Sequence, residues 1–202
     1  AYIPIRDRHV PGGEMWVTES GDAGCGGNTW ASTFLDVFRT ANELGTFAQL
    51  TNGVIFHNTL ASSDYGFVSH TTFNPRPNYW LAHIYTQLMG TTVYDTKEEI
   101  KEGAHVFAHS RKDGKEGVCY MIVNNSLTNT TTVELEKDAE VYVLSADSIR
   151  NPKMKLNGVE LNLDENNMSL THSSLWEHQI FDLLILYKTF DFDNYDLLFL
   201  GW

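Results

Sequence analysis

The sequence has few cysteines, few basic residues and no hydrophobic run of membrane-spanning length. Two cysteines, Cys25 and Cys119, occur in 202 residues, which excludes a disulfide framework and a CxxC metal motif, so we expect two free thiols. Lysine and arginine total 14 against 26 aspartates and glutamates, and the net charge of −12 argues against a nucleic-acid groove or an anionic membrane surface. The apolar run at residues 183–187 is too short to span a bilayer, and no targeting segment is visible.

The first 91 residues alternate between patterns typical of strands and of helices. With 42% hydrophobic and 20% charged residues, the chain is globular rather than disordered. Short β-branched and apolar runs predict buried strands, and apolar stripes at helical spacing predict helices between them. The predicted elements are a strand at residues 15–18, a glycine-rich loop at 21–27, a helix at 28–44 that ends at Gly45, a strand at 53–57 and a helix that begins at Pro77 and ends at Gly90.

Residues 92–187 change to short runs separated by turn residues, a spacing typical of an antiparallel β-sandwich. An Asn157-Gly158 pair predicts a two-residue hairpin turn. The predicted strands lie at residues 105–109, 118–123, 131–135, 141–144, on both sides of that turn at 155–160, and at 180–187. Residues 188–202 form a tail that this pattern leaves unassigned.

Two parallel β/α units cannot form a folded domain by themselves, because parallel strands need neighbours on both faces and both edges. A complete (β/α)₈ barrel takes about 250 residues. We therefore predict that residues 1–91 are the last two β/α units of a TIM-type barrel, whose earlier strands are missing from this chain. The alternative is that these units pack on a partner.

A carboxylate, Glu19, ends the first predicted strand directly before the glycine-rich loop. In a β/α barrel the carboxyl ends of the strands carry the catalytic residues, and a carboxylate there can attack an anomeric carbon or accept a proton. The repeated glycines let backbone N–H groups approach a ligand closely. The structural alternative is that Glu19 caps the loop or forms an ion pair.

The residues around Glu19 resemble glycoside hydrolase family 79, the heparanases and β-glucuronidases. The likeness begins with the run MWVTESGDAGCGG, from Met15 to Gly27, which is similar to the family's nucleophile strand and glycine loop. It continues through residues 28–31, 53–58, 64–66, 73–80 and 88–91. The sandwich that follows fits the family in layout but carries no diagnostic motif.

The resemblance implies a retaining mechanism on a uronic-acid-bearing saccharide, with no metal and no cofactor. Glu19 matches the family's nucleophile. Tyr65 and the loop residues Gly24, Cys25 and Gly26 match the elements that hold the uronate carboxylate. Backbone N–H groups and a phenol O–H can bind a carboxylate without a cation beside the reacting centre.

Two further residues are expected to line the same pocket. They are His57, which ends the second predicted strand, and Asn58, which follows it. For His57, a structural hydrogen bond is the alternative. A family-79 enzyme would suit a secreted, periplasmic or lysosomal-type compartment, but no segment of this sequence decides between them.

The sequence departs from the family pattern at two points. Cys25 stands where the family usually has glycine, so it is strained if the position needs a positive φ and tolerated if its N–H merely faces the sugar. Retaining hydrolysis also needs a second carboxyl, which in the family follows an Asn, and no Asn-Glu pair precedes Glu19. Asn42-Glu43 lies inside a predicted helix. We therefore expect this chain alone to be inactive and to need the missing barrel half or to self-associate.

Other readings of the sequence are possible. The chain could be a non-catalytic carbohydrate-binding or structural module. A zinc site could be built on His105 and His109, which share one face of a predicted strand, but no further ligand is suitably spaced. The run ahead of Trp30-Ala31 faintly resembles a papain-type start, yet Thr29 stands where the nucleophilic cysteine should be.

Overall fold

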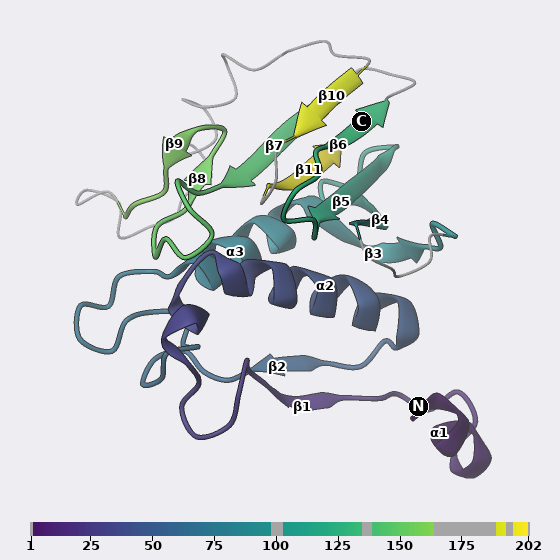
Figure 1. The fold of residues 1–202 in the computed structure, drawn as a ribbon. Helices are drawn as coiled ribbons and strands as arrows, with labels where there is room; N and C mark the ends of the chain where they lie inside the picture. The colour runs from purple at the N-terminus through teal and green to yellow at the C-terminus, as the bar shows by residue number, and fades with distance from the viewer. Residues whose placement is uncertain (1, 98–102, 135–138, 164–188, 193–195, 202) are drawn as a thin grey trace.

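The computed structural model describes residues 2–97, 103–134, 139–163, 189–192 and 196–201. These residues form successive layers: a pair of parallel strands, two helices, a seven-stranded antiparallel sheet and a small two-stranded sheet (Figure 1). The fold is thus mixed α/β with a large antiparallel sheet, as the sequence predicted in outline. The strand predicted at residues 180–187 lies outside the described residues. No helix in the described ranges is long and apolar enough to cross a membrane.

The first layer is formed by β1 (Val17–Ser20) and β2 (Ile55–His57), which pair in parallel. Val17 pairs with Ile55 and Ser20 with His57, so three steps along β1 match two along β2 and the register contains a bulge. A short helix, α1 (Ile3–His9), precedes β1. The sequence analysis did not predict α1, because its seven residues are too few to show a helical stripe.

The second layer is formed by the helices α2 (Leu35–Leu50) and α3 (Pro77–Leu88). The prediction for α3 is confirmed to within two residues. The prediction of one helix at residues 28–44 is wrong at both ends: a 3₁₀ turn, η1 (Thr29–Ser32), comes first, and α2 continues six residues past its predicted end.

Gly45 lies within α2 and does not terminate the helix. Gly45 is buried, and a Cβ atom there would lie 2.3 Å from the ring of Phe107. The glycine therefore allows α2 to approach the sheet closely. A C-terminal stop and a close-packing position use the same residue type, and the sequence pattern does not distinguish them.

The third layer is an antiparallel sheet with the strand order β3-β4-β5-β11-β7-β8-β9. The strands are β3 (Met89–Tyr94), β4 (Ala104–Arg111), β5 (Val118–Asn124), β7 (Glu140–Ser145), β8 (Lys155–Leu156), β9 (Val159–Glu160) and β11 (Leu197–Gly201). β6 (Thr131–Glu134) pairs with β10 (Thr189–Phe192) in the small sheet. The hairpin between β8 and β9 is confirmed, and its turn residues Asn157 and Gly158 have φ values of 50° and 82°, as this turn type requires. The predicted boundary between residues 91 and 92 falls inside β3.

The tail that the sequence analysis left unassigned supplies a central strand. β11 lies between β5 and β7 and pairs with both. Its residues Leu197 to Leu200 are at most 1% exposed. A continuous apolar run of this kind is typical of a strand buried on both faces and was the available signal.

The two faces of β11 enter two different hydrophobic clusters. Leu197 and Phe199 join the main core between the helices and the sheet, together with α2 and α3 side chains such as Val37 and Leu81. Leu198 and Leu200 belong to a smaller cluster on the opposite face of the sheet, against which Val133 of β6 packs. The helices therefore share one core with the antiparallel sheet, and this packing positions the strands β1 and β2 on the far side of the helices (Figure 1).

Candidate active site

Glu19 is the third residue of β1 and is exposed near the carboxyl end of that strand. The backbone N–H of Asn58 donates to the carbonyl oxygen of Ser20 at 2.8 Å, which extends the strand pairing by one residue. The carboxyl ends of parallel strands meet at one edge, so Glu19, His57 and Asn58 come together there. With Thr18 and Phe56 they line an open depression of about 340 Å³.

The Asn58 side chain links Glu19 to Tyr65. Asn58 Nδ2 donates to Glu19 Oε1 at 2.9 Å and to the Tyr65 hydroxyl oxygen at 3.3 Å. The structure thus brings together three of the residues that the sequence singled out, from β1, the end of β2 and the loop after it. Among the described residues, the hydrogen bond of the Glu19 carboxylate is to Oε1, and the residue lines the open depression.

The glycine-rich loop lies against the ring of Tyr65, which is 6% exposed. A Cβ on Gly21 would lie 3.2 Å from the Tyr65 ring, and a Cβ on Gly27 would lie 2.5 Å from it. Gly27 also has a φ of +82°, which L side chains rarely adopt. Glycine at these two positions therefore lets the loop cover the tyrosine.

The loop tip faces open space. A Cβ on Gly24 or Gly26 would meet nothing within 4 Å. Cys25 is exposed and has a φ of 57°. This position therefore has the positive φ at which the sequence analysis expected a cysteine backbone to be strained. Among the described residues, the tip joins the rest of the site through the Gly26 carbonyl, which accepts a hydrogen bond from the Asp64 N–H at 3.1 Å. Both cysteines are free, as predicted.

Arg76, to which the sequence analysis gave no role, anchors the loop that carries Tyr65. Arg76 Nη1 donates to the backbone carbonyls of Ser63, Asp64 and Gly66. The Ser32 hydroxyl donates to the Asp64 carbonyl at 2.8 Å as well. These bonds satisfy carbonyls that have no strand or helix partner. The Arg-Pro pair at the start of α3 was the available signal, but a pattern of residue types does not show which carbonyls an arginine reaches.

His57 holds the same loop from the other side. Its Nε2 lies 2.7 Å from the Tyr65 carbonyl oxygen, so Nε2 carries the proton and donates. The ring stacks on Phe67 at a centroid distance of 4.1 Å. Burial lowers the pKa of His57, and the positive charge of Arg39 lowers it further. This geometry fits the structural alternative for His57, a neutral ring that positions Tyr65.

A partly buried charge network lies between β1 and α2. Arg39 binds Asp36 through two hydrogen bonds of 2.5 and 3.0 Å and reaches Glu43 at 3.1 Å. The Ser20 hydroxyl donates to Glu43 at 2.5 Å. Burial raises the pKa of Asp36, although its bonds to Arg39 oppose that shift. The network holds Ser20 on the helix side of β1, which leaves its neighbour Glu19 on the open side.

His105, His109 and Asp22 have structural partners. His105 Nδ1 lies 2.6 Å from the Asn42 side-chain oxygen, and His109 Nδ1 lies 2.8 Å from the Gly90 carbonyl oxygen. No group of three or more potential metal ligands occurs in the described part of the chain. Asp22 accepts hydrogen bonds from the Asn28 backbone and side chain at 3.0 and 3.2 Å, just ahead of η1.

Comparisons with known proteins bear on this arrangement. No protein-family model matches the chain. It is 34% identical over 141 residues to heparanase-like protein 1 of Arabidopsis thaliana, an alignment that covers 69% of this chain and 26% of that protein. It is 27% identical over 161 residues to baicalin-β-D-glucuronidase of Scutellaria baicalensis, which covers 76% of this chain and 30% of that protein. This chain is a relative of the heparanases and β-glucuronidases of glycoside hydrolase family 79.

The family-79 relationship confirms the resemblance that the sequence showed around Glu19. The chain spans between a quarter and a third of the length of these two relatives. A solved structure, the GH51 arabinofuranosidase from Xanthomonas axonopodis pv. citri, matches the fold with a TM-score of 0.52 at 12% identity. That match covers 84% of this chain and 35% of the other, and it supports a fold related to TIM-barrel proteins.

Proposed function

We propose that this chain is part of a retaining glycoside hydrolase that acts on uronic-acid-containing glycosides, with Glu19 as the nucleophile. The observation that carries the proposal is the position of Glu19. It is an exposed carboxylate near the carboxyl end of a parallel strand; Asn58 holds one of its oxygens, and the residue lines an open depression. The family-79 relationship supports the same chemistry.

In the proposed reaction, the free oxygen of Glu19 attacks the anomeric carbon and forms a covalent glycosyl-enzyme, while an acid protonates the departing oxygen. Water then releases the sugar with retained configuration. The Tyr65 hydroxyl and the backbone N–H groups of Gly24, Cys25 and Gly26 bind the uronate carboxylate. These neutral donors recognise an anion and leave the charge balance at the anomeric carbon undisturbed.

The acid must be a second carboxyl about 5 to 5.5 Å from Glu19. No Asn-Glu pair precedes Glu19 in this sequence. We assign the acid to a residue outside these 202 residues, on a neighbouring strand of a (β/α)₈ barrel to which residues 1–91 contribute two β/α units. Residues 92–187 and the tail strand β11 form the accompanying β-sandwich domain in this proposal.

The surface of the strand pair supports the barrel proposal. Trp16, Val54 and Phe56 are 55%, 44% and 47% exposed, and the rings of Trp16 and Phe56 lie 6.0 Å apart. Apolar side chains of this size on a two-stranded parallel sheet need a cover. We propose that further barrel strands supply the cover, and that another copy of the chain replaces them when they are missing.

The alternative is a non-catalytic carbohydrate-binding or structural module that keeps the depression at Glu19 but does not carry out the reaction. The Glu19→Gln variant decides between the two in a protein that includes the proposed barrel strands. The substitution keeps the shape but removes the anionic attacker, so turnover of an aryl β-glucuronide should fall by at least about 1,000-fold. Glu14→Gln is the matched control, because Glu14 is an exposed carboxylate five residues earlier and should leave the rate unchanged.

Four further observations complete this test. The melting temperature of Glu19→Gln should match that of the parent protein. NMR of the reaction of the parent protein should show that the first product has the β configuration. The 202-residue chain alone should show no turnover and should self-associate in light scattering. Activity of Glu19→Gln within tenfold of the parent would show that Glu19 is not the nucleophile. A monomeric 202-residue chain with full turnover would refute the assignment of the acid to another part of the barrel.

A further inference from the structure

Three Asn-X-Ser/Thr triplets, the acceptor motif for N-linked glycans, occur in the sequence, and they begin at Asn124, Asn129 and Asn167. A motif this short also occurs by chance, so the sequence alone does not show which triplet can be used. A glycan is joined to the side-chain nitrogen of the asparagine, and a folded protein can carry it only where that nitrogen faces solvent. Asn167 lies outside the described residues, and the structure separates the other two.

The first triplet is buried. Asn124 is the last residue of β5 and is 1% exposed, and Ser126, which completes the triplet, is 9% exposed. Asn124 Nδ2 donates to the Asn129 carbonyl oxygen at 3.0 Å, and its Oδ1 accepts from the Ser126 N–H at 3.1 Å. A glycan on Asn124 would have to pass through packed protein. The fold therefore excludes this triplet as a carrier.

The buried triplet instead builds the turn that presents the second one. The Ser126 hydroxyl oxygen accepts hydrogen bonds from the N–H groups of Thr128 and Asn129 at 3.2 and 2.9 Å. The Asn125 side-chain oxygen accepts from Asn42 of α2 at 2.8 Å, which ties the start of the turn to the helix layer. With the bond from Asn124, the N–H and the carbonyl of Asn129 are both fixed.

The side chain of Asn129 is exposed at the tip of this turn. Residues 127–130 are four consecutive exposed residues. The Thr128 hydroxyl lies 3.5 Å from Asn129 Oδ1, but within the part of the chain that the structure describes, Asn129 Nδ2 donates no hydrogen bond. Thr131, the first residue of β6, supplies the hydroxyl that the motif requires at its third position. A fixed backbone thus presents a free acceptor nitrogen to solvent.

The surroundings of Asn129 leave room for a large group. It lies two residues before β6, whose Val133 packs on the face of the large sheet opposite to the helices. The depression at Glu19 lies in the strand layer on the other side of those helices (Figure 1). A glycan on Asn129 would therefore leave the depression open.

We propose that Asn129 is an N-glycosylation site of this protein and that Asn124 is not. In the reaction, Asn129 Nδ2 attacks the anomeric carbon of a lipid-linked oligosaccharide diphosphate in a eukaryotic secretory pathway. The new C–N bond replaces the bond between that carbon and the diphosphate oxygen, the lipid diphosphate leaves, and Nδ2 gives up one proton. The proposal does not depend on the catalytic reaction proposed for Glu19.

The test is site-by-site mapping of the protein that includes the proposed barrel strands, secreted from insect cells. The folded fraction is isolated by size-exclusion chromatography and treated with a peptide N-glycosidase, which converts a glycan-bearing asparagine to aspartate. Peptide mass spectrometry then reads each triplet separately. We expect aspartate at position 129 and unchanged asparagine at position 124. A folded fraction with unmodified Asn129, or with a glycan on Asn124, would overturn the proposal.

Variants within the triplet show that the glycan depends on the motif. Thr131→Ala should abolish the glycan on Asn129, whereas Thr131→Ser should keep it. Thr130→Ala is the matched control, because Thr130 is an exposed threonine at the unrestricted middle position and its loss should leave the glycan in place. Melting temperatures of the same variants from a bacterial host, which adds no such glycan, separate loss of the motif from damage to β6. A glycan that persists in Thr131→Ala would contradict the proposal.

Discussion

The Nδ2 group of Asn58 donates a hydrogen bond of 2.9 Å to Oε1 of Glu19 and reaches the Tyr65 hydroxyl oxygen at 3.3 Å. One amide group thus restrains one oxygen of the proposed nucleophile and orients the phenol that is proposed to hold the substrate carboxylate. The backbone of Asn58 is itself fixed to Ser20, the residue after Glu19. Asn58 is therefore a positioning residue for both groups.

Replacing Asn58 by alanine should lower turnover more than substrate binding. We expect kcat for an aryl β-glucuronide to fall by about 10 to 100-fold, because a misplaced nucleophile loses its near-attack geometry. Asn52→Ala is the control, since Asn52 is exposed in the turn before β2. Steady-state kinetics in a protein with the complete barrel provide the measurement. A rise in KM with unchanged kcat would instead place Asn58 in direct contact with substrate.

Tyr65→Phe should reduce the preference for uronides over neutral glycosides. The variant loses a hydrogen bond to a charged group, which contributes about 1.5 to 3 kcal/mol, so the ratio of kcat/KM for glucuronide and glucoside should fall by about 10 to 150-fold. Tyr79→Phe, at a half-buried position of α3 that packs against the main core, is the control. An equal loss on both substrates would show that the Tyr65 hydroxyl matters only for packing.

Gly45→Ala should destabilise the protein although alanine is the better helix former. A Cβ at Gly45 would lie 2.3 Å from the Phe107 ring. Overpacking of this kind costs about 1 to 3 kcal/mol, which exceeds the gain in helix propensity of about 1 kcal/mol. Urea unfolding measures the change. Phe107→Leu should offset part of the loss in the double variant, and a more stable Gly45→Ala protein would contradict the close packing of α2 on β4.

Acid should weaken the fold through the buried His109 and the half-buried His57. Burial lowers the pKa of His109 and of His57 from their ordinary value of 6.5. Below about pH 6.5 the unfolded chain therefore takes up protons that the folded protein excludes, and the free energy of unfolding falls until the pH passes the lowered pKa values. Above that range the contribution is fully present. Urea unfolding at pH 7.5 and 5.5 gives the difference.

The matched variants separate His109 from other causes. His109→Asn should reduce the difference between the two pH values, with the remainder due in part to His57. His70→Asn replaces an exposed histidine and should leave the difference unchanged. If His109→Asn has the same pH dependence as the parent protein, the folded state accepts the proton at His109.

The sequence by itself determined several of the local elements and the family resemblance around Glu19. Asn157-Gly158 specifies its hairpin because few residue pairs adopt two successive positive φ values, and the run around Glu19 carries its chemistry in adjacent residues. Such features depend on neighbours along the chain. The pattern at residues 197–200 is equally local, because a continuous apolar run is typical of a strand that is buried on both faces.

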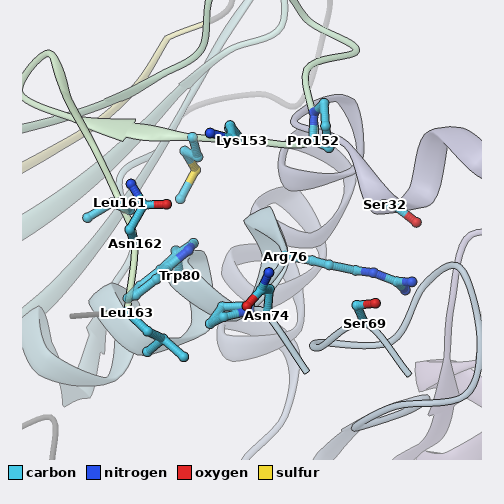
Figure 2. A pocket seen from close by; sticks show the side chains of 12 residues that line it. Ser32, Ser69, Asn74, Arg76, Trp80, Pro152, Lys153, Leu161, Asn162 and Leu163 are labelled. Carbon is cyan, nitrogen blue, oxygen red and sulfur yellow. The ribbon is translucent and has the colours of Figure 1, made fainter. Parts of the chain in front are cut away.

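Only the tertiary structure decided which distant residues meet. Asn58 reaches Glu19 across 39 positions, Gly45 faces Phe107 from another layer, and Arg76 spans carbonyls in a loop without regular structure. A pocket of about 370 Å³ joins residues 69–76 to residues 152–154 and 161–163 (Figure 2). These contacts arise because the helices and the large sheet share one core, and that packing brings together side chains whose spacing along the chain carries no periodic pattern.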